Sequence, residues 1–189
     1  MPMTEVVWHG RGGQGAKTAS YILAEAAMEE GAKIQAFPEY GAERRGAPMK
    51  SYVRISDAPI RLRCAVTAPQ VVVVLDPTLL GSVDVTEGLA KDGVLIVNTS
   101  EPPSDVRRQL NTNDYKLYTV DATKIALETI KRPIPNTPML GALAKTTDLL
   151  TIKGATTAVR KKFQGKLAPT VIEGNVQAIE RAHEEVRGE

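Results

Sequence analysis

Three glycines near the start of the chain have the spacing of a phosphate-binding loop. Gly10, Gly12 and Gly15 form the pattern G-x-G-x-x-G within the stretch GRGGQG, directly after a β-rich run at residues 4–8. In dinucleotide-binding proteins this pattern lets the backbone turn sharply, so that N–H groups and a helix N-terminus face the pyrophosphate. The pattern therefore predicts a loop for a phosphate-bearing ligand. The alternative is a tight turn that serves only to join a strand to a helix.

A nicotinamide dinucleotide needs a second group, a carboxylate at the end of the second strand that holds the ribose hydroxyls. Glu39 is the candidate, but it follows Pro38 in a segment rich in other charges. The sequence has no P-loop lysine, no G-x-S-x-G nucleophile and no recognisable acid–base pair of carboxylates. These observations disfavour a stand-alone dehydrogenase.

The stretch EYGAERRGAP, residues 39–48, gathers several charged side chains in one glycine-punctuated segment. Glu43, Arg44 and Arg45 are consecutive within it. Adjacent arginines can each hold a phosphate or carboxylate through two parallel hydrogen bonds. We expect this second loop beside the glycine loop at the carboxyl edge of the sheet, where open α/β sheets bind ligands or partners. An ordinary solvated loop is the alternative.

The sequence contains no pattern typical of a metal or iron–sulfur site. Cys64 is the only cysteine, so neither an internal disulfide nor a cysteine-ligated cluster can form. His9 and His183 stand far apart, with no ligand spacing around either. We expect Cys64 to be a small buried residue, and His9 to be a hydrogen-bonded residue at a strand end.

The composition is typical of a soluble globular domain. Of the 189 residues 42% are hydrophobic, 24% charged and 4% aromatic, and the net charge of +2 does not favour nucleic acid as a partner. The start MPMTEVVWHG lacks the pattern of a signal peptide, and the longest apolar run, VVVVL, is too short to cross a membrane. We therefore expect a cytoplasmic protein that binds neither nucleic acid nor membrane.

Strands and helices alternate over the first two thirds of the chain. Strands are predicted at residues 4–8, 33–37, 49–56, 70–75, 93–98 and 116–120, and helices at 16–30, 87–91 and 121–131. Asp121 is the expected N-cap of the last of these helices. Residues 4–37 are predicted to form a β–loop–α–β unit of a parallel sheet, and Pro38 is predicted to end its second strand. The proline-containing segment 100–105 is predicted to be a loop.

The last third is helical in pattern. Thr137 before Pro138 predicts an N-cap followed by proline at the first helical position, and residues 155–163 predict a shorter helix. A stripe near the end is expected to be buried: Ile172, Val176, Ile179 and Val186. We predict a single α/β domain over residues 1–189, with a Rossmann-like, mostly parallel sheet flanked by helices to about residue 131 and a helical section from about residue 132.

The order of three motifs resembles that of a known family. GRGGQGAKTAS, EYGAERRGAP and PNTPMLGALAK (residues 135–145) are similar to motifs of the gamma subunit of 2-oxoacid:ferredoxin oxidoreductases, and the resemblance covers nearly the whole chain. The sequence departs from the family at Ala47, where a second glycine is common after the arginine–glycine step.

The resemblance implies a multi-subunit enzyme that converts a 2-oxoacid, with pyruvate favoured, and coenzyme A to an acyl-CoA and carbon dioxide. It also implies that electrons pass to ferredoxin or another acceptor. Thiamine diphosphate, magnesium and iron–sulfur clusters would belong to the alpha, beta and delta-type subunits, in agreement with the lone Cys64. The gamma subunit would lie at subunit interfaces and help to position coenzyme A, and it is expected to be inactive alone.

The resemblance assigns two groups of residues to coenzyme A or interface contact and none to catalysis. The first is the glycine loop: Gly10, Arg11, Gly12, Gly13, Gln14 and Gly15. The second is Glu43, Arg44 and Arg45. A nicotinamide-dependent dehydrogenase and a non-enzymatic nucleotide-binding or structural protein remain as alternatives. These motifs do not specify the 2-oxoacid, the acceptor or the stoichiometry.

Overall fold

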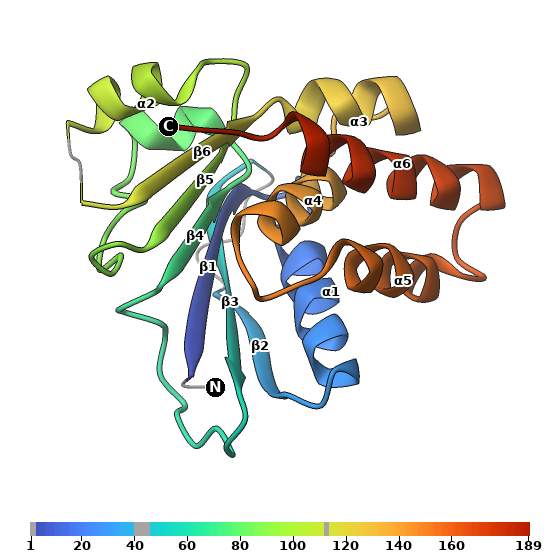
Figure 1. Cartoon of the computed structure of the whole chain (residues 1–189), viewed down its shortest axis with the longest axis horizontal. Helices are drawn as coiled ribbons and strands as arrows, with labels where there is room; N and C mark the ends of the chain where they lie inside the picture. Colours follow the sequence, from blue (N-terminus) through green and yellow to red (C-terminus); the bar gives the residue numbers. More distant parts are fainter. Residues whose placement is uncertain (1–2, 40–45, 112–113) are drawn as a thin grey trace.

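A computed structural model describes residues 3–39, 46–111 and 114–189 of the chain. Within these residues a seven-stranded mixed sheet has the order β2-β3-β1-β4-β5-β6-β7 (Figure 1). The strands are β1 Thr4–Arg11, β2 Lys33–Glu39, β3 Pro48–Ser56, β4 Val71–Val74, β5 Val94–Asn98, β6 Lys116–Val120 and β7 Arg187–Gly188. Adjacent pairs among β1, β4, β5 and β6 are parallel, whereas β3 and β7 pair antiparallel with their neighbours.

Helices flank the sheet on both faces, as predicted. They are α1 Ala16–Glu29, the 3₁₀ helix η1 Pro77–Gly81, α2 Pro103–Leu110, α3 Ala122–Ile130, α4 Asn136–Thr146, α5 Ile152–Phe163 and α6 Pro169–Glu185. Helices α1 and α3 to α6 cover one face, and η1 and α2 pack on the other (Figure 1). In the part of the chain that the structure describes, no helix combines the length and apolar character needed to span a membrane.

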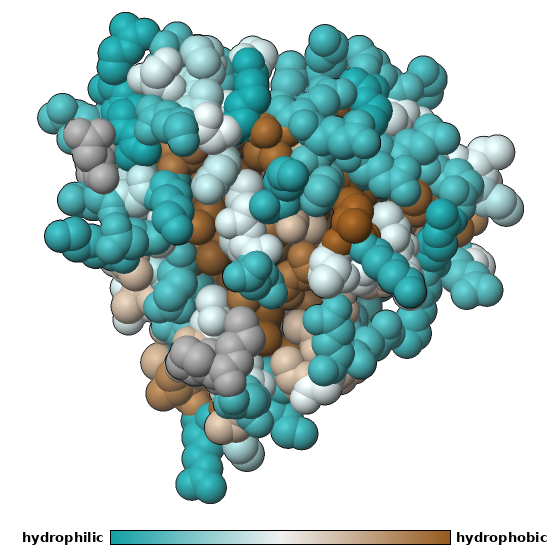
Figure 2. Space-filling model, viewed as in Figure 1, coloured by the Kyte–Doolittle hydropathy of each residue, from teal (hydrophilic) through white to brown (hydrophobic). Residues whose placement is uncertain are grey.

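The core is divided by the sheet, because successive strand residues point to opposite faces. In β4, Val71 and Val73 pack with the larger helical layer, whereas Val72 and Val74 pack with η1 and α2. The apolar run VVVVL is therefore buried on both sides, as expected for an inner parallel strand. Figure 2 shows hydrophobic residues in the middle of one face of the molecule, surrounded by hydrophilic ones.

The elements of the predicted β–loop–α–β unit follow one another along the chain as β1, α1 and β2, but β1 and β2 are not neighbours in the sheet. Strands β1 and β2 run in the same direction, yet β3 lies between them and pairs antiparallel with both. Strand β3 can fold back on β2 without a crossover helix, and its mostly buried residues suit an inner position better than the half-buried β2 does. Pro38 lies inside β2, opposite Ser51, because an edge strand tolerates the missing N–H. The prediction that Pro38 ends the strand was wrong.

Two connections also differ from the prediction. Residues 87–91 form turns, and the short helix of this connection is η1, where Asp76 accepts a hydrogen bond from Thr78 N at 2.9 Å. The segment predicted as a loop begins α2, because Pro103 occupies an early helical position where an N–H has no intrahelical partner. Asp121 caps α3 as predicted and accepts from Lys124 N at 3.0 Å.

The helical C-terminal section is confirmed, but α4 begins at Asn136, two residues earlier than predicted. Thr137 is buried and donates its hydroxyl hydrogen bond to Asn175 Oδ1 at 2.7 Å, so it joins α4 to α6 instead of capping α4. Gly141 allows the same two helices to approach closely, because a Cβ at this position would lie 2.0 Å from the carbonyl oxygen of Ile179.

The apolar stripe predicted near the C-terminus is buried only in its middle. Val176 and Ile179 are buried in the core of α6, in agreement with the prediction. Ile172 and Val186 are partly exposed, so the stripe does not lie wholly inside the fold.

Candidate functional site

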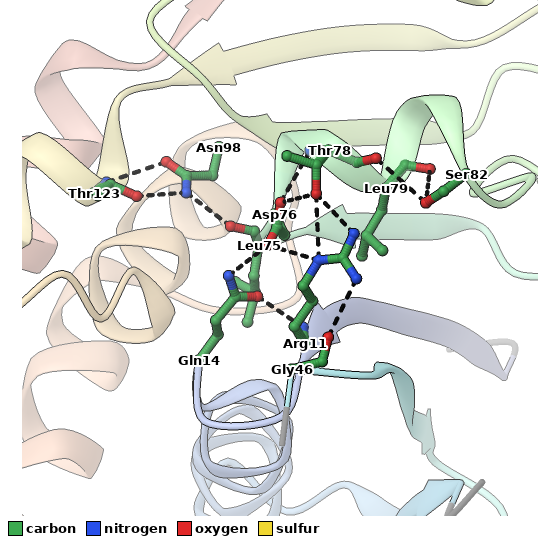
Figure 3. A network of polar contacts seen from close by, with 10 residues as sticks. All are labelled: Arg11, Gln14, Gly46, Leu75, Asp76, Thr78, Leu79, Ser82, Asn98 and Thr123. Carbon is green, nitrogen blue, oxygen red and sulfur yellow. Dashed lines mark hydrogen bonds and ion pairs between the residues drawn. The ribbon is translucent and has the colours of Figure 1, made fainter. Parts of the chain in front are cut away.

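Two side chains meet where β1 and β4 end at the carboxyl edge of the sheet (Figure 3). Arg11 is the last residue of β1 and Asp76 follows the neighbouring parallel strand β4. The connection that leaves β1 enters α1 on one face, whereas the connection that leaves β4 enters η1 on the other. Open α/β sheets bind ligands and partners at such a switch point. We therefore take this edge as the candidate site.

Asp76 is the centre of a polar network at this edge (Figure 3). Its Oδ2 accepts from Gln14 Nε2 at 2.7 Å and lies 3.2 Å from Arg11 Nε. Its Oδ1 accepts from Thr78 N at 2.9 Å and from the Thr78 hydroxyl at 2.6 Å. Burial opposes ionisation, but the hydrogen bonds from Thr78 and Gln14 and the charge of Arg11 outweigh it and hold the pKa of Asp76 below its usual range. Asp76 is therefore an ionised structural acceptor.

The glycine loop forms the sharp strand-to-helix turn that its sequence predicts. Gly13 and Gly15 have φ values of +100° and +85°, which glycine adopts without steric cost. Gln14 closes the turn, because its Oε1 accepts from Arg11 N at 2.7 Å and its own N donates to Arg11 O at 3.1 Å. The backbone N–H groups of Arg11 and Gln14 therefore donate hydrogen bonds within the loop itself.

The end of the second loop is fastened to the first. Arg11 Nη1 donates to the carbonyl oxygen of Gly46 at 3.2 Å, and Gly12 N donates to that of Ala47 at 3.1 Å. Arg11 Nη2 also donates to the Thr78 hydroxyl at 2.8 Å, which fixes the guanidinium from its other side. The two loops therefore meet through Gly46 and Ala47, as expected. Glu43, Arg44 and Arg45 lie outside the described residues.

The third sequence motif also reaches the glycine loop. Asn136, at the start of α4, is 7% exposed, and its side chain packs directly against Gly15. A Cβ on Gly15 would lie 2.6 Å from Asn136 Nδ2. The segment 135–145 thus covers the N-terminus of α1, and all three motifs converge at one edge of the sheet.

Asn98 extends the network to the next strand, β5. Its Nδ2 donates to Leu75 O and to the Thr123 hydroxyl, both at 2.8 Å, and its Oδ1 accepts from Thr123 N at 3.1 Å (Figure 3). We did not predict Asp76 or Asn98 as site residues. The signal that could have identified them is their place at the ends of the apolar runs VVVVLD and VLIVN, since the carboxyl ends of parallel strands share one edge.

Glu39 does not occupy the position of a ribose-binding carboxylate. Because β3 separates β1 from β2 and neighbouring strands lie about 4.8 Å apart, Glu39 is about 10 Å from the end of β1. Its carboxylate instead accepts a hydrogen bond from the Tyr52 hydroxyl. Burial, followed by this hydrogen bond, raises the pKa of Tyr52, so the hydroxyl keeps its proton. The stand-alone dehydrogenase therefore loses its main candidate residue.

Cys64 is exposed, and the prediction that it is buried was wrong. Its backbone is held by Arg54, whose Nη1 donates to Cys64 O at 2.9 Å, while Arg54 Nη2 donates to Ala65 O at 3.2 Å. Among the described residues, no group of three or more histidine, cysteine, aspartate or glutamate side chains could hold a metal ion.

His9 is 4% exposed at the end of β1. Burial, and next the charge of Lys50, lower the pKa of His9 to about 4, so the ring is neutral at pH 7. The expected hydrogen bond of the ring stays a prediction; its nitrogens are not among the buried polar atoms of the described residues that lack a partner.

The chain matches known sequences over almost its whole length. Residues 5–185 match the family described as pyruvate ferredoxin/flavodoxin oxidoreductase. The chain is 52% identical to "Pyruvate synthase subunit PorC" of Thermotoga maritima, over 97% of this chain and 94% of that protein. It is 50% identical to "Pyruvate/ketoisovalerate oxidoreductases common subunit gamma" of Pyrococcus abyssi, over 98% of each.

Solved structures give the same result. The crystal structure of pyruvate oxidoreductase subunit PORC from Thermotoga maritima superposes with a TM-score of 0.87 at 46% identity, over 100% of this chain and 99% of that one. The 2-oxoglutarate:ferredoxin oxidoreductase from Magnetococcus marinus, with coenzyme A bound, has a TM-score of 0.79 at 16% identity. This chain covers 31% of that longer protein, and the likeness is one of fold alone.

Proposed function

The chain belongs to the pyruvate ferredoxin/flavodoxin oxidoreductase family as a gamma-type subunit, and we propose that it serves a complex that oxidatively decarboxylates a 2-oxoacid to an acyl-CoA. Pyruvate is the favoured substrate, because relatives at 52% and 50% identity carry that name. The proposed partners are alpha, beta and delta-type subunits, with ferredoxin or another protein accepting the electrons. The proposed location is the cytoplasm.

We assign the redox chemistry to the partner subunits. An iron–sulfur cluster is held by several cysteine thiolates, and this sequence has Cys64 alone. Nor do the described residues include a group that could hold magnesium beside thiamine diphosphate. The described residues therefore fit neither cofactor, and we assign this chain a part in binding and positioning.

The observation that carries the proposal for this chain is the attachment of the second loop to the glycine loop. Gly46 and Ala47 are held by Arg11 and Gly12 at the switch point of the sheet, and Arg45 directly precedes Gly46 in the sequence. The positive end of the α1 dipole adds a preference for anions at this edge. This arrangement supports a contact with the phosphates of coenzyme A.

Within this site we assign different roles to the arginines. Arg11 is paired with Asp76, so we propose that it holds the loops in place and contributes little net charge to a ligand. Arg44 and Arg45 directly precede Gly46 in the sequence, and we assign them to phosphate or subunit contact. Guanidinium groups suit phosphate because they donate two parallel hydrogen bonds.

The test is Arg45→Ala in the assembled enzyme, with Arg132→Ala, at an exposed arginine after α3, as the matched control. A hydrogen bond to a charged group contributes about 1.5–3 kcal/mol, so Arg45→Ala should raise the KM for coenzyme A by about ten- to a hundredfold. Decarboxylation measured without coenzyme A should not change, and Arg132→Ala should behave as the unmodified enzyme. If Arg45→Ala impairs assembly while the residual complex keeps a normal KM for coenzyme A, the loop is an interface element and the coenzyme A assignment is wrong.

A further inference from the structure

A second polar cluster lies on the sheet face that carries η1. His9 on β1 pairs with Lys50 on β3, and Lys50 pairs with Glu39 on β2, so the three residues form one row across the sheet. Directly paired residues share a face, and residues two positions away in the same strands, such as Val7 and Tyr52, pack on the η1 and α2 side. The row therefore lies on the face opposite α1.

The row borders two adjoining cavities of about 200 Å³ and 220 Å³. His9, Glu39 and Lys50 line both of them. Apolar residues form part of the walls: Val7, Val66 and Val72 in the first cavity, and Leu79 and Val83 in the second. This space can accept an extended side chain with an apolar stem and a polar head.

A neighbouring row of the same sheet shows a guanidinium in a comparable setting. Arg54 on β3 stands between Glu5 on β1 and Gln35 on β2 and is 1% exposed. It lies 2.6 Å from Glu5 Oε1, donates to Gln35 Oε1 at 2.8 Å, and its guanidinium carbon is 5.7 Å from the ring centre of Phe37. In the His9 row the middle residue, Lys50, instead reaches outward to the exposed Glu87 at 3.6 Å.

The charges at the His9 row favour a cation. Among the described residues, Glu39 and Glu87 line the first cavity together with Lys50, and Asp84 acts on His9 less strongly than Lys50 does. The Tyr52 hydroxyl donates to Glu39 Oε2 and thereby orients that carboxylate toward a fixed position. A phosphate or carboxylate ligand would meet this excess of negative charge, whereas a guanidinium or ammonium would be stabilised by it.

The His9 ring adds an acceptor that faces the cavities. It lines both of them, and its nitrogens are not among the enclosed polar atoms of the described residues that lack a partner, so they are open to the cavities. A neutral imidazole offers one N–H donor and one acceptor nitrogen. The acceptor nitrogen can therefore receive a hydrogen bond from a donor that enters the cavities.

We propose that these cavities receive an arginine side chain from a neighbouring subunit of the complex. Its stem would lie along the valines, and its guanidinium would donate to Glu39 and to the acceptor nitrogen of His9. Arginine suits the site better than lysine because its planar group reaches two acceptors at once and is more weakly hydrated. The identity of the partner rests on the proposed function, but the cation site itself does not.

The first test uses the free full-length chain with ¹⁵N-labelled histidine and N-ethylguanidinium as the probe. His9 and His183 are the only histidines, so His183 is an internal control. We expect a saturable shift of the His9 ring signals in the millimolar range, as befits a probe of few atoms, with His183 unchanged. Glu39→Gln, which keeps an acceptor for Tyr52, should weaken this binding about tenfold. An unshifted His9, or a shift caused by coenzyme A and not by the probe, would overturn the proposal.

The second test measures how tightly the chain binds the remaining subunits. Glu39→Gln should weaken assembly about tenfold and reduce its salt dependence, because a charged contact is lost. Glu173→Gln, at an exposed acid paired with Arg160 in the helical layer, is the matched control and should assemble normally. Both variants should melt like the unmodified chain. If Glu39→Gln assembles normally, the arginine contact is refuted; if no complex exists but the probe shifts His9, the cation site stands and the proposed function fails.

Discussion

Arg11 Nε lies 3.2 Å from Asp76 Oδ2 at the switch point, where the connections that follow β1 and β4 run to opposite faces of the sheet. Arg11 also donates to the carbonyl of Gly46, so this ion pair joins the glycine loop, η1 and the end of the second loop in one structure. The geometry of the site therefore depends on an aspartate that belongs to none of the three sequence motifs.

Asp76→Asn should destabilise the fold by about 2 kcal/mol. The amide NH₂ of the new asparagine would face the N–H donors of Gln14 and Arg11, so these donors would lose an acceptor at a site where Asp76 is 9% exposed. The partial exposure of Arg11 reduces the loss of stability, because water can solvate its guanidinium. Urea unfolding measures this difference. Asp105→Asn, which removes an exposed partner of Arg108, is the control and should cause no comparable loss. Equal stability of Asp76→Asn and the unmodified chain would contradict the role of Asp76 as the centre of the network.

The same carboxylate predicts an acid dependence of stability. Because the pKa of Asp76 is lower in the native state than in the unfolded chain, its contribution is present above the unfolded pKa of about 3.9 and is lost as the pH falls through the native pKa. The urea midpoint of the unmodified chain should therefore decrease more steeply below pH 4 than that of Asp76→Asn. Parallel pH profiles for the two proteins would show that Asp76 does not titrate as the structure requires.

Gly15→Ala and Gly13→Ala separate backbone strain from side-chain contact. Both residues have positive φ, so each alanine should cost about 1 kcal/mol, but only the Cβ at Gly15 would collide with Asn136. Gly15→Ala should therefore cost about 1–3 kcal/mol more than Gly13→Ala. Adding Asn136→Ala should recover part of that excess in a double-mutant cycle. Equal costs for the two glycine variants would mean that Asn136 does not press on the loop.

Assembly should protect the glycine loop from hydrogen exchange. We expect slower exchange at residues 10–15 in the complex than in the free chain, because this edge of the sheet would become an interface. The buried centre of α6, around Ile179, should exchange equally slowly in both samples and is the internal control. Equal exchange of residues 10–15 in the two samples would exclude an interface role for the loop.

Local sequence signals predicted the parts of the fold that depend on neighbouring residues. The apolar run of β4, the glycine turn before α1 and the capping Asp121 each lie where the pattern placed them. The position of β3 between β1 and β2 was not predicted, because strand order depends on long-range pairing that no local pattern contains. That one difference also removed Glu39 from the ribose position.

The site was predicted only where a backbone requirement is visible in the sequence. Gly13 and Gly15 identify the turn because their conformation needs glycine, whereas the partners Asp76 and Asn136 come from distant segments and carry ordinary polar side chains. The exposure of Cys64 could not be predicted either, because the contact that holds its backbone comes from Arg54 on another element, which no local pattern reveals.

The most direct measurement is the composition and activity of the assembly that this chain forms. The chain is tagged, purified with its partners, and compared with the same chain purified alone for iron content and for reduction of ferredoxin that depends on pyruvate and coenzyme A. We predict an iron-containing, active complex that loses its coenzyme-A-dependent activity when this chain is removed, and an isolated chain with neither iron nor turnover. Stoichiometric iron in the isolated chain, or NAD-dependent turnover by it alone, would contradict the assignment as a gamma-type subunit without redox centres.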